Sequence, residues 1–335
     1  MATIDRILII AEAGVNHNGD LRLAKELALK AGEAGADIVK YQTFKPENLV
    51  TENADKAGYQ KITTGEQGTQ LDMLKKLALS DDAFRELYAY CKEIGIRFLS
   101  TAFDMDSIGF LHELGCETWK IPSGEITNLP YLRKIASYGQ KVILSTGMAT
   151  MEETGKAITV LKDGGTRDIT VLHCTTAYPA PFDQINLRAM CTLEEQFHLP
   201  VGYSDHSRGI AIPCAAAALG ARVIEKHFTL DRNMEGPDHK ASLEPDELKQ
   251  MTDAIRAIEA ALGDGKKIPT ELEIENSKVA RKSIVARKAI LKGEMLTEDN
   301  LTVKRPGTGL SPMLWDSVIG THATKDFKAD DLIWM

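Results

Sequence analysis

Two histidines follow short apolar runs late in the chain, each beside a carboxylate. His206 ends the stretch Tyr-Ser-Asp-His, and His227 lies in Glu-Lys-His-Phe-Thr. A single histidine of this kind is more often a hydrogen-bonded core residue. Two at corresponding strand ends favour a shared metal site, because two imidazoles with carboxylates suit Mn²⁺, Zn²⁺ or Fe²⁺. With no thiolate in reach by spacing, we expect Mn²⁺ or a similar ion, which would polarise a carbonyl.

Two lysines, Lys40 and Lys120, follow strongly apolar strand stems, where a buried cation needs a counter-charge or takes a shifted pKa. One interpretation is a pair of structural salt bridges, to Glu12 and Glu125. The other is a cradle for a phosphate or carboxylate, helped by nearby hydroxyls and backbone amides: Ser123, Ser145 and the N–H groups of Gly124 and Gly147. The many small hydroxyl residues beside glycine favour the anion cradle.

Other polar groups near the strand ends have structural interpretations by default. We expect Cys174 and His173 to pack in the core and His17 to lie at a loop tip. The five cysteines show no CxxC spacing, which indicates buried thiols in a reducing compartment.

Eight short β-rich runs alternate with helical patterns and must position these residues. Over about 260 residues this alternation predicts a (β/α)8 barrel, whose functional side chains gather at the C-terminal ends of the strands. A doubly wound open sheet is the alternative. The expected strands are Ile7–Glu12, Asp37–Thr43, Arg97–Thr101, Thr118–Ile121, Lys141–Ser145, Thr170–Cys174, Pro200–Tyr203 and Arg222–Glu225; the expected helices include Leu21–Ala34, Ala83–Ile94, Ser107–Leu114, Met151–Leu161 and Asp246–Leu262.

Two segments interrupt the alternation. Lys45–Thr69 is long, polar and glycine-containing, so we expect an elaborated loop after the second strand. The polar stretch 263–269 is typical of a linker. We therefore expect a barrel domain at 1–264, a linker at 265–280 and a small domain of short strands at 281–335, the strands being 283–291, 301–304 and 331–334.

Composition excludes several classes of protein. The 335 residues carry 40 Lys and Arg against 48 Asp and Glu, a net charge of −8. This balance argues against sequence-independent binding of nucleic acid, which needs a basic face. The N-terminus has no signal-peptide pattern, and the apolar stretch 210–219 is too short to span a bilayer. We expect a cytoplasmic protein with neither a nucleic-acid nor a membrane partner.

Seven ordered motifs resemble the sialic acid synthase family. They are Ala-Glu-Ala-Gly-Val-Asn-His-Asn-Gly (11–19), Val-Lys-Tyr-Gln-Thr (39–43), Lys-Ile-Pro-Ser-Gly-Glu (120–125), Ser-Thr-Gly-Met (145–148), Tyr-Ser-Asp-His (203–206), Glu-Lys-His-Phe-Thr (225–229) and Gly-Pro-Asp-His (236–239). The tail, with Lys-Arg-Pro-Gly (304–307), resembles the antifreeze-like (SAF) domain. The resemblance implies a TIM barrel followed by a SAF domain. It also implies condensation of phosphoenolpyruvate (PEP) with an N-acetylated mannose-type sugar, giving a nine-carbon 2-keto acid and phosphate.

The resemblance also implies roles for individual residues. The divalent metal, Mn²⁺ with Mg²⁺ or Co²⁺ as alternatives, would be bound by His206 and His227. Family members are homodimers in which the small domain reaches into the partner's barrel, where Arg305 would meet the sugar. PEP would be held by Lys40, Thr101, Lys120, Ser123, Ser145 and Ser204; the sugar by Glu12, Gln42, Tyr178 and Asp238; and catalysis would involve Glu125, between the sugar carbonyl and metal-bound water, with Glu12, Lys40 and Lys120.

The acceptor differs between branches of the family. The stretches 173–182, 204–209 and 236–245 look more like legionaminate synthases, which implies 2,4-diacetamido-2,4,6-trideoxymannose as acceptor. N-acetylneuraminate synthesis from N-acetylmannosamine is the alternative, ahead of pseudaminate synthesis, a metal-dependent keto-acid aldolase, and a carbohydrate- or ice-binding protein. Ala102 replaces the usual proline of the third-strand motif, and Ala177 replaces a glutamate of many relatives; we expect both to tune loop geometry or acceptor fit.

Overall fold

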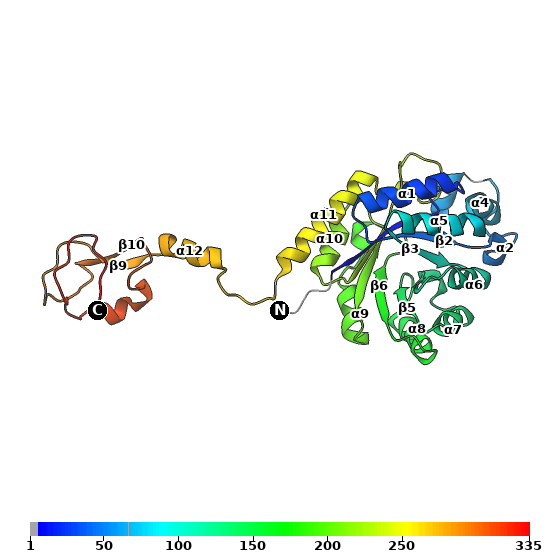
Figure 1. Ribbon diagram of the computed structural model, residues 1–335. Helices are drawn as coiled ribbons and strands as arrows, with labels where there is room; N and C mark the ends of the chain where they lie inside the picture. Colours follow the sequence, from blue (N-terminus) through cyan, green and yellow to red (C-terminus); the bar gives the residue numbers. More distant parts are fainter. Residues whose placement is uncertain (1–5, 66) are drawn as a thin grey trace. The chain divides into compact units, whose positions relative to one another are not determined.

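The computed structural model describes residues 6–65 and 67–335. The chain divides into two compact units, Met1–Asp264 and Gly265–Met335, which Figure 1 shows coloured along the sequence. The segment 265–280, expected to be a linker, contains the helix α12 (Glu271–Ala280), which has no buried residue. Within the described residues, no helix is long and apolar enough to cross a bilayer.

The first unit is a (β/α)8 barrel, as the alternation predicted. All of its neighbouring strands pair in parallel, in the order β3-β2-β1-β8-β7-β6-β5-β4. The two strands at the ends of this order, β3 and β4, pack against each other and close the barrel. The strands are β1 Leu8–Gly14, β2 Ile38–Thr43, β3 Arg97–Ala102, β4 Thr118–Ile121, β5 Lys141–Ser145, β6 Ile169–Cys174, β7 Val201–Asp205 and β8 Val223–His227.

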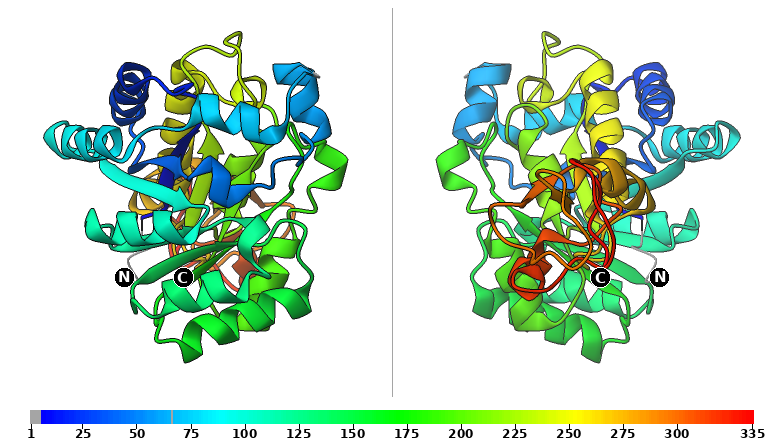
Figure 2. Two further views of the ribbon diagram at one scale, coloured as in Figure 1. Left: turned by 90° about the vertical axis from the view of Figure 1, so that its right-hand side faces the viewer. Right: turned by 90° about the vertical axis from the view of Figure 1, so that its left-hand side faces the viewer.

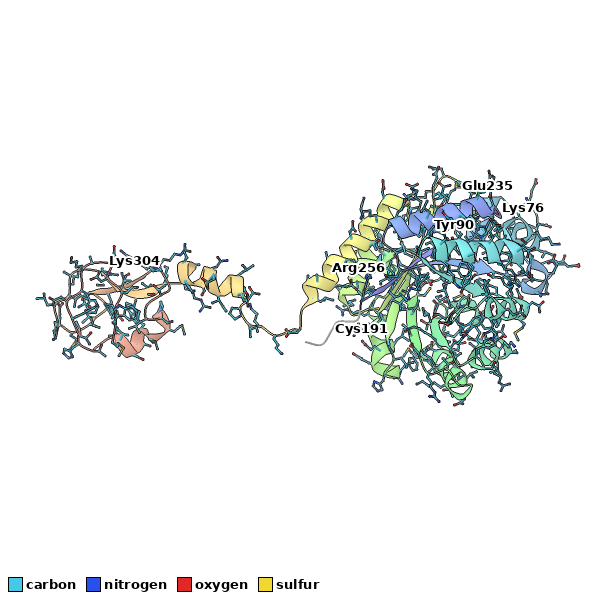
Figure 3. The ribbon with its side chains drawn as sticks, in the orientation of Figure 1. Lys76, Tyr90, Cys191, Glu235, Arg256 and Lys304 are labelled. Atoms are coloured by element: carbon cyan, nitrogen blue, oxygen red, sulfur yellow. The ribbon has the colours of Figure 1, made fainter. Side chains whose placement is uncertain are left out.

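Helices surround the strands, as Figure 2 shows. All five helices named from periodicity form: α1 Leu21–Glu33, α5 Asp81–Glu93, α6 Met105–Glu113, α8 Met151–Asp163 and α11 Pro245–Leu262. Their starts follow capping chemistry. The side chain of Asp20 accepts from the Arg22 N–H at the start of α1, and Thr150 and Glu153 form a capping box on α8. Helices α7 Leu129–Ala136, α9 Ala189–Phe197 and α10 Ala211–Ala218 complete the outer layer.

The inner face of the barrel has an apolar layer beneath a polar one. Side chains alternate across a strand, so residues two apart share a face. The apolar layer is a separate buried cluster: Ile10, Ile38, Leu99, Ile143, Leu172 and Val223. Two residues further along each of these strands, toward its C-terminal end, come Glu12, Lys40, Thr101, Ser145, Cys174 and Glu225, which line one cavity. The strand period therefore brings four of the predicted site residues, Glu12, Lys40, Thr101 and Ser145, together above an apolar layer.

The segment Lys45–Thr69, expected to be a loop, contains two short helices instead. These are α2 (Pro46–Leu49) and α3 (Gly58–Thr64), and α4 (Gln70–Leu77) follows directly. Buried side chains of α4, with Val15 and Phe44, form an apolar cluster of their own. We call the segment 45–78 the β2 insertion.

The second unit has its own small core. Strands β9 (Ser283–Ala286) and β10 (Leu301–Lys304) pair in antiparallel fashion, and a short helix, α13 (Trp315–Val318), follows. The expected strand 331–334 is wrong: only an isolated bridge from Leu332 to Val285 forms there. The core consists of Ile284, Ala286, Ile290, Leu296, Leu301, Val318, Ala323, Phe327 and Ile333.

Candidate active site

Lys40 and Lys120 lie side by side in the polar layer of the barrel. Both are 3% exposed, and both line a cavity of ≈180 Å³ at the C-terminal ends of the strands. The Nζ of Lys40 lies 2.6 Å from Oε2 of Glu12 and 3.2 Å from Oγ1 of Thr101. The Nζ of Lys120 donates to Oγ of Ser145 at 2.7 Å. The expected salt bridge from Lys40 to Glu12 is therefore present, and the ion-paired Lys40 still lines the cavity, so the anion cradle stays a prediction.

Glu225 on β8 connects the two lysines and was not among the predicted site residues. Its carboxylate lies 3.7 Å from Lys40 Nζ and 3.4 Å from Lys120 Nζ, and it accepts from Ser204 Oγ at 2.9 Å. Lys120 therefore pairs with Glu225 and not with Glu125, which corrects the expected salt bridge. The signal was available in the motif Glu-Lys-His, because Glu225 lies two residues before His227 and must share its face.

Burial and neighbouring charges set opposite shifts within this cluster. Burial opposes charge on Lys40, but the carboxylates of Glu12 and Glu225 outweigh it and raise the pKa of Lys40. At Lys120 burial prevails and the pKa is lowered. Burial raises the pKa of Glu12, whereas at Glu225 the two lysines outweigh burial and hold the pKa well below its usual range. Burial therefore outweighs the neighbouring charges at Lys120 and Glu12, whereas the neighbouring charges outweigh burial at Lys40 and Glu225.

Hydroxyl groups and a closely packed glycine line the same cavity. Ser123, Ser145, Ser204 and Thr101 all line it. The Gly147 N–H donates to Ser123 Oγ at 2.8 Å, and a Cβ on Gly147 would come within 2.3 Å of Thr176 Oγ1. Only glycine lets the backbone approach this closely.

The two histidines line the same cavity and lie next to each other. Their ring centroids are 5.3 Å apart, and Tyr178 packs on His206 at 4.2 Å. The Nδ1 of His206 is 2.8 Å from the Thr175 carbonyl oxygen, which leaves its Nε2 for a ligand. The Nδ1 of His227 is buried without a hydrogen-bond partner among the described residues, and burial lowers the pKa of this imidazole well below its usual value.

These features fit a divalent metal of the borderline class. An orphaned nitrogen on a neutral imidazole, beside a second imidazole, is a donor pair suited to such ions. Within residues 6–65 and 67–335, no group of three or more His, Cys, Asp or Glu side chains is arranged to hold a metal. An ion bound by the two histidines would take its remaining ligands from water or substrate.

Three of the residues assigned to the sugar line a second cavity that adjoins the first. Gln42, Tyr178 and Asp238 lie there with His227, whereas Glu12 lies in the central cavity. Gln42 Nε2 donates to Glu12 Oε1 at 3.0 Å and so bridges the two groups. Asp238 is buried, and burial followed by repulsion from Glu12 raises its pKa to about 6.

Two predicted residues lie outside these cavities. Glu125, in the 3₁₀ turn Ser123–Glu125 after β4, is half-buried and accepts from Asn128 Nδ2 at 2.6 Å; burial raises its pKa. It is absent from both linings. Arg305 belongs to the second unit, where its Nε donates to the Ala280 carbonyl at 3.0 Å. The roles given to both stay predictions.

The structural interpretations of Cys174 and His173 fit the structure, whereas that of His17 is wrong. Cys174 is buried as expected, but it also lines the central cavity with its Sγ 3.8 Å from His206 Nδ1, which corrects the expectation that no thiol lies near the histidines. His17 is 1% exposed and accepts from the Gly19 N–H at 3.1 Å, so it is no loop tip. His173 is a hydrogen-bonded structural residue, with Nε2 2.7 Å from the Ile185 carbonyl oxygen.

Comparisons with known proteins agree with the motifs. The chain is 56% identical to the N,N'-diacetyllegionaminic acid synthase of Campylobacter jejuni, covering 98% of this chain and 99% of that one. It is 46% identical to the enzyme of the same name from Legionella pneumophila, covering 97% and 93%. A solved N-acetylneuraminic acid synthetase from Leptospira borgpetersenii, in complex with citrate, matches with a TM-score of 0.73 at 36% identity, covering 82% and 90%.

Family assignments cover both units. Residues 281–333 match the SAF domain. Residues 27–267, most of the barrel, match the NeuB family, and this match together with full-length relatives above 30% identity shows that the chain belongs to the NeuB family.

Proposed function

We propose that this synthase condenses PEP with 2,4-diacetamido-2,4,6-trideoxymannose to give N,N'-diacetyllegionaminate and inorganic phosphate. The main support for the proposal is that the buried lysines Lys40 and Lys120 line one cavity. Ser123, Ser145 and Ser204 line the same cavity. Such a cluster suits a ligand with both a phosphate and a carboxylate. The relatives named as diacetyllegionaminic acid synthases support this choice of acceptor.

The reaction joins C3 of PEP to the aldehyde carbon of the open-chain sugar, and the resulting alkoxide takes up a proton. Water adds to the positive centre at C2 of PEP, with Glu125 as the base that accepts its proton. The bond from C2 to the phosphate oxygen then breaks, phosphate leaves with the electron pair, and the new C2 hydroxyl gives up its proton to the departing phosphate as it becomes the keto group. Lys40 and Lys120 stabilise the phosphate and carboxylate charges throughout.

We also propose that His206 and His227 hold Mn²⁺, with Mg²⁺ or Co²⁺ as substitutes. When bound, the ion would polarise the sugar carbonyl. The free thiols of the five cysteines fit a cytoplasmic location. We propose a homodimer in which the partner's Arg305 contacts the sugar.

Phosphate release tests the proposal. The protein is supplied with PEP and Mn²⁺ and given either the diacetamido sugar or N-acetylmannosamine, with and without EDTA. We expect faster release with the diacetamido sugar and loss of release with EDTA. A preference for N-acetylmannosamine would make the enzyme an N-acetylneuraminate synthase with the same site. No release with either sugar would overturn the proposed function.

A further inference from the structure

A second cavity, of ≈280 Å³, adjoins the lysine cavity. The two linings share Gln42, Phe103, Tyr178 and His227, so the cavities meet beside one of the two histidines. Their chemistry differs. The first contains both buried lysines, whereas no lysine or arginine is among the described residues that line the second.

The walls of this second cavity are mainly apolar. Met73, Leu74 and Leu77 of α4 are each at most 8% exposed and pack with Val15 and Phe44. Leu49 and Val50, at the end of α2, lie half-buried against the same cluster. A concave, mostly apolar lining with a few polar groups is the usual form of a small-molecule site.

Most of this wall belongs to the β2 insertion. A closed (β/α)8 barrel needs only a short connection after each strand. Here the insertion contributes α2 and α4, whose apolar side chains face a cavity and not only the barrel core. The insertion therefore has a feature that fold stability alone does not require.

Charge decides which substrate each cavity suits. PEP carries a phosphate and a carboxylate, so it belongs with the lysines. The acceptor sugar is neutral, so it needs no cation, and a mainly apolar cavity whose described lining has no lysine or arginine accepts it at lower desolvation cost than PEP. Its aldehyde must stay near the junction with PEP, which leaves the far end of the sugar, C4 to C6, to enter the second cavity.

We propose that this second cavity, the acceptor chamber, binds the C6 methyl and the C4 acetamido group of the acceptor, and that the β2 insertion thereby selects the diacetamido sugar. This inference rests on the proposed function. N-acetylmannosamine would bring hydroxyls to both positions, and a hydroxyl buried without hydrogen-bond partners is costly. Met73 and Val50 are then specificity-determining residues.

Two near-isosteric substitutions test the chamber, Met73→Gln and Val50→Thr. Each adds polarity to the chamber wall with little change of volume. The measurement is kcat/KM for phosphate release with each sugar, and the ratio of the two values is compared with wild type. We expect each variant to lower the preference for the diacetamido sugar about tenfold, the effect of one apolar contact. Leu71→Gln is the matched control, because Leu71 lies half-buried on α4 outside the chamber lining.

The outcomes separate the chamber from the proposed function. Wild-type phosphate release that is faster with the diacetamido sugar than with N-acetylmannosamine establishes the proposed function regardless of the variants. An unchanged ratio in both variants, or an equal change in Leu71→Gln, overturns the chamber. A second measurement uses the wild type alone: removing the 6-hydroxyl of N-acetylmannosamine should raise kcat/KM severalfold. An unchanged or lower value overturns the C6 assignment even if the variants fail to fold.

Discussion

Replacing Lys120 tests whether the positive charges of the cavity bind PEP. Replacing it by Met removes the cation 3.4 Å from Glu225, leaving Lys40 at 3.7 Å as the remaining buried lysine beside that carboxylate. We expect Lys120→Met to lower kcat/KM for PEP by about 10²–10³, the effect of losing one preorganised charge-stabilising group.

Steady-state phosphate release at varied PEP measures this effect. The control is Lys156→Met on α8, since Lys156 forms only an exposed ion pair with Glu152. A Lys120→Met enzyme with wild-type kinetics would remove Lys120 from the proposed anion cradle.

His206 carries the proposed metal site together with His227. We expect His206→Ala to lose bound Mn²⁺, because one imidazole is a poor site for a divalent ion without further protein ligands. Metal content per chain after dialysis is the measurement, with turnover as a second readout. His112→Ala is the control, as His112 lies exposed on α6 and stacks on Tyr138. Unchanged Mn²⁺ content in His206→Ala would contradict the ligand assignment.

His17 couples folding to acid pH. Burial lowers its pKa from 6.5 to about 4, so the unfolded chain takes up this proton at a higher pH than the folded chain does. Its contribution to the free energy of unfolding is therefore complete above pH 6.5 and is lost as the pH falls toward 4, by about 3 kcal/mol in full. We expect the free energy of unfolding, measured with urea, to fall less between pH 7 and pH 5 in His17→Asn than in the wild type. Parallel losses would show that His17 does not titrate in this window.

At the scale of elements, strands β7 and β8 are joined at their C-terminal ends by a fully buried ion pair. Lys226 Nζ lies 2.5 Å from Asp205 Oδ2, and both side chains are 0% exposed. Each residue precedes a histidine in sequence, so the pair fixes the strand ends that present His206 and His227. We expect Lys226→Met to cost about 3–5 kcal/mol of unfolding free energy, because it leaves a buried carboxylate unpaired.

Urea unfolding measures the loss, and a double variant interprets it. Adding Asp205→Asn removes the unpaired carboxylate charge. In the wild type the Ser207 N–H donates to Asp205 Oδ1 at 2.9 Å, and the Oδ1 of an asparagine can still accept this hydrogen bond. The double variant should recover part of the stability. If it unfolds as readily as the single variant, packing of the lysine chain and not charge explains the loss.

The strands and the residues at their ends could be predicted from the sequence, but the contacts between side chains of different strands across the barrel could not. Lys40 and Lys120 follow apolar strand stems and were expected to be buried, as the structure shows, and the eight strands formed close to their predicted bounds. The partner of Lys120 lies on β8, far along the chain, and only barrel closure brings Glu225 there. The elaborated segment after β2 was expected, but its helices α2 and α3 were missed because they have four and seven residues, too few to show a helical period.

At the scale of the molecule, two units with separate cores raise the question of whether one active site needs both. The second unit packs its own cluster around Ile284 and Phe327, and it carries Arg305, whose proposed role is in the site of the partner subunit. A C2 dimer exchanging such domains would build each site from two chains.

Complementation between two inactive variants tests this arrangement. Lys120→Met disables the barrel site and leaves Arg305, whereas Arg305→Ala does the reverse. In a mixed dimer, the chain with an intact barrel receives Arg305 from its partner, so co-expression should restore about a quarter of wild-type activity, one working site in half of the dimers. Each variant purified alone is the control. If the mixture stays as inactive as its components, Arg305 acts in the barrel of its own chain or in neither barrel. Such a result would contradict the proposed exchange of domains between catalytic sites.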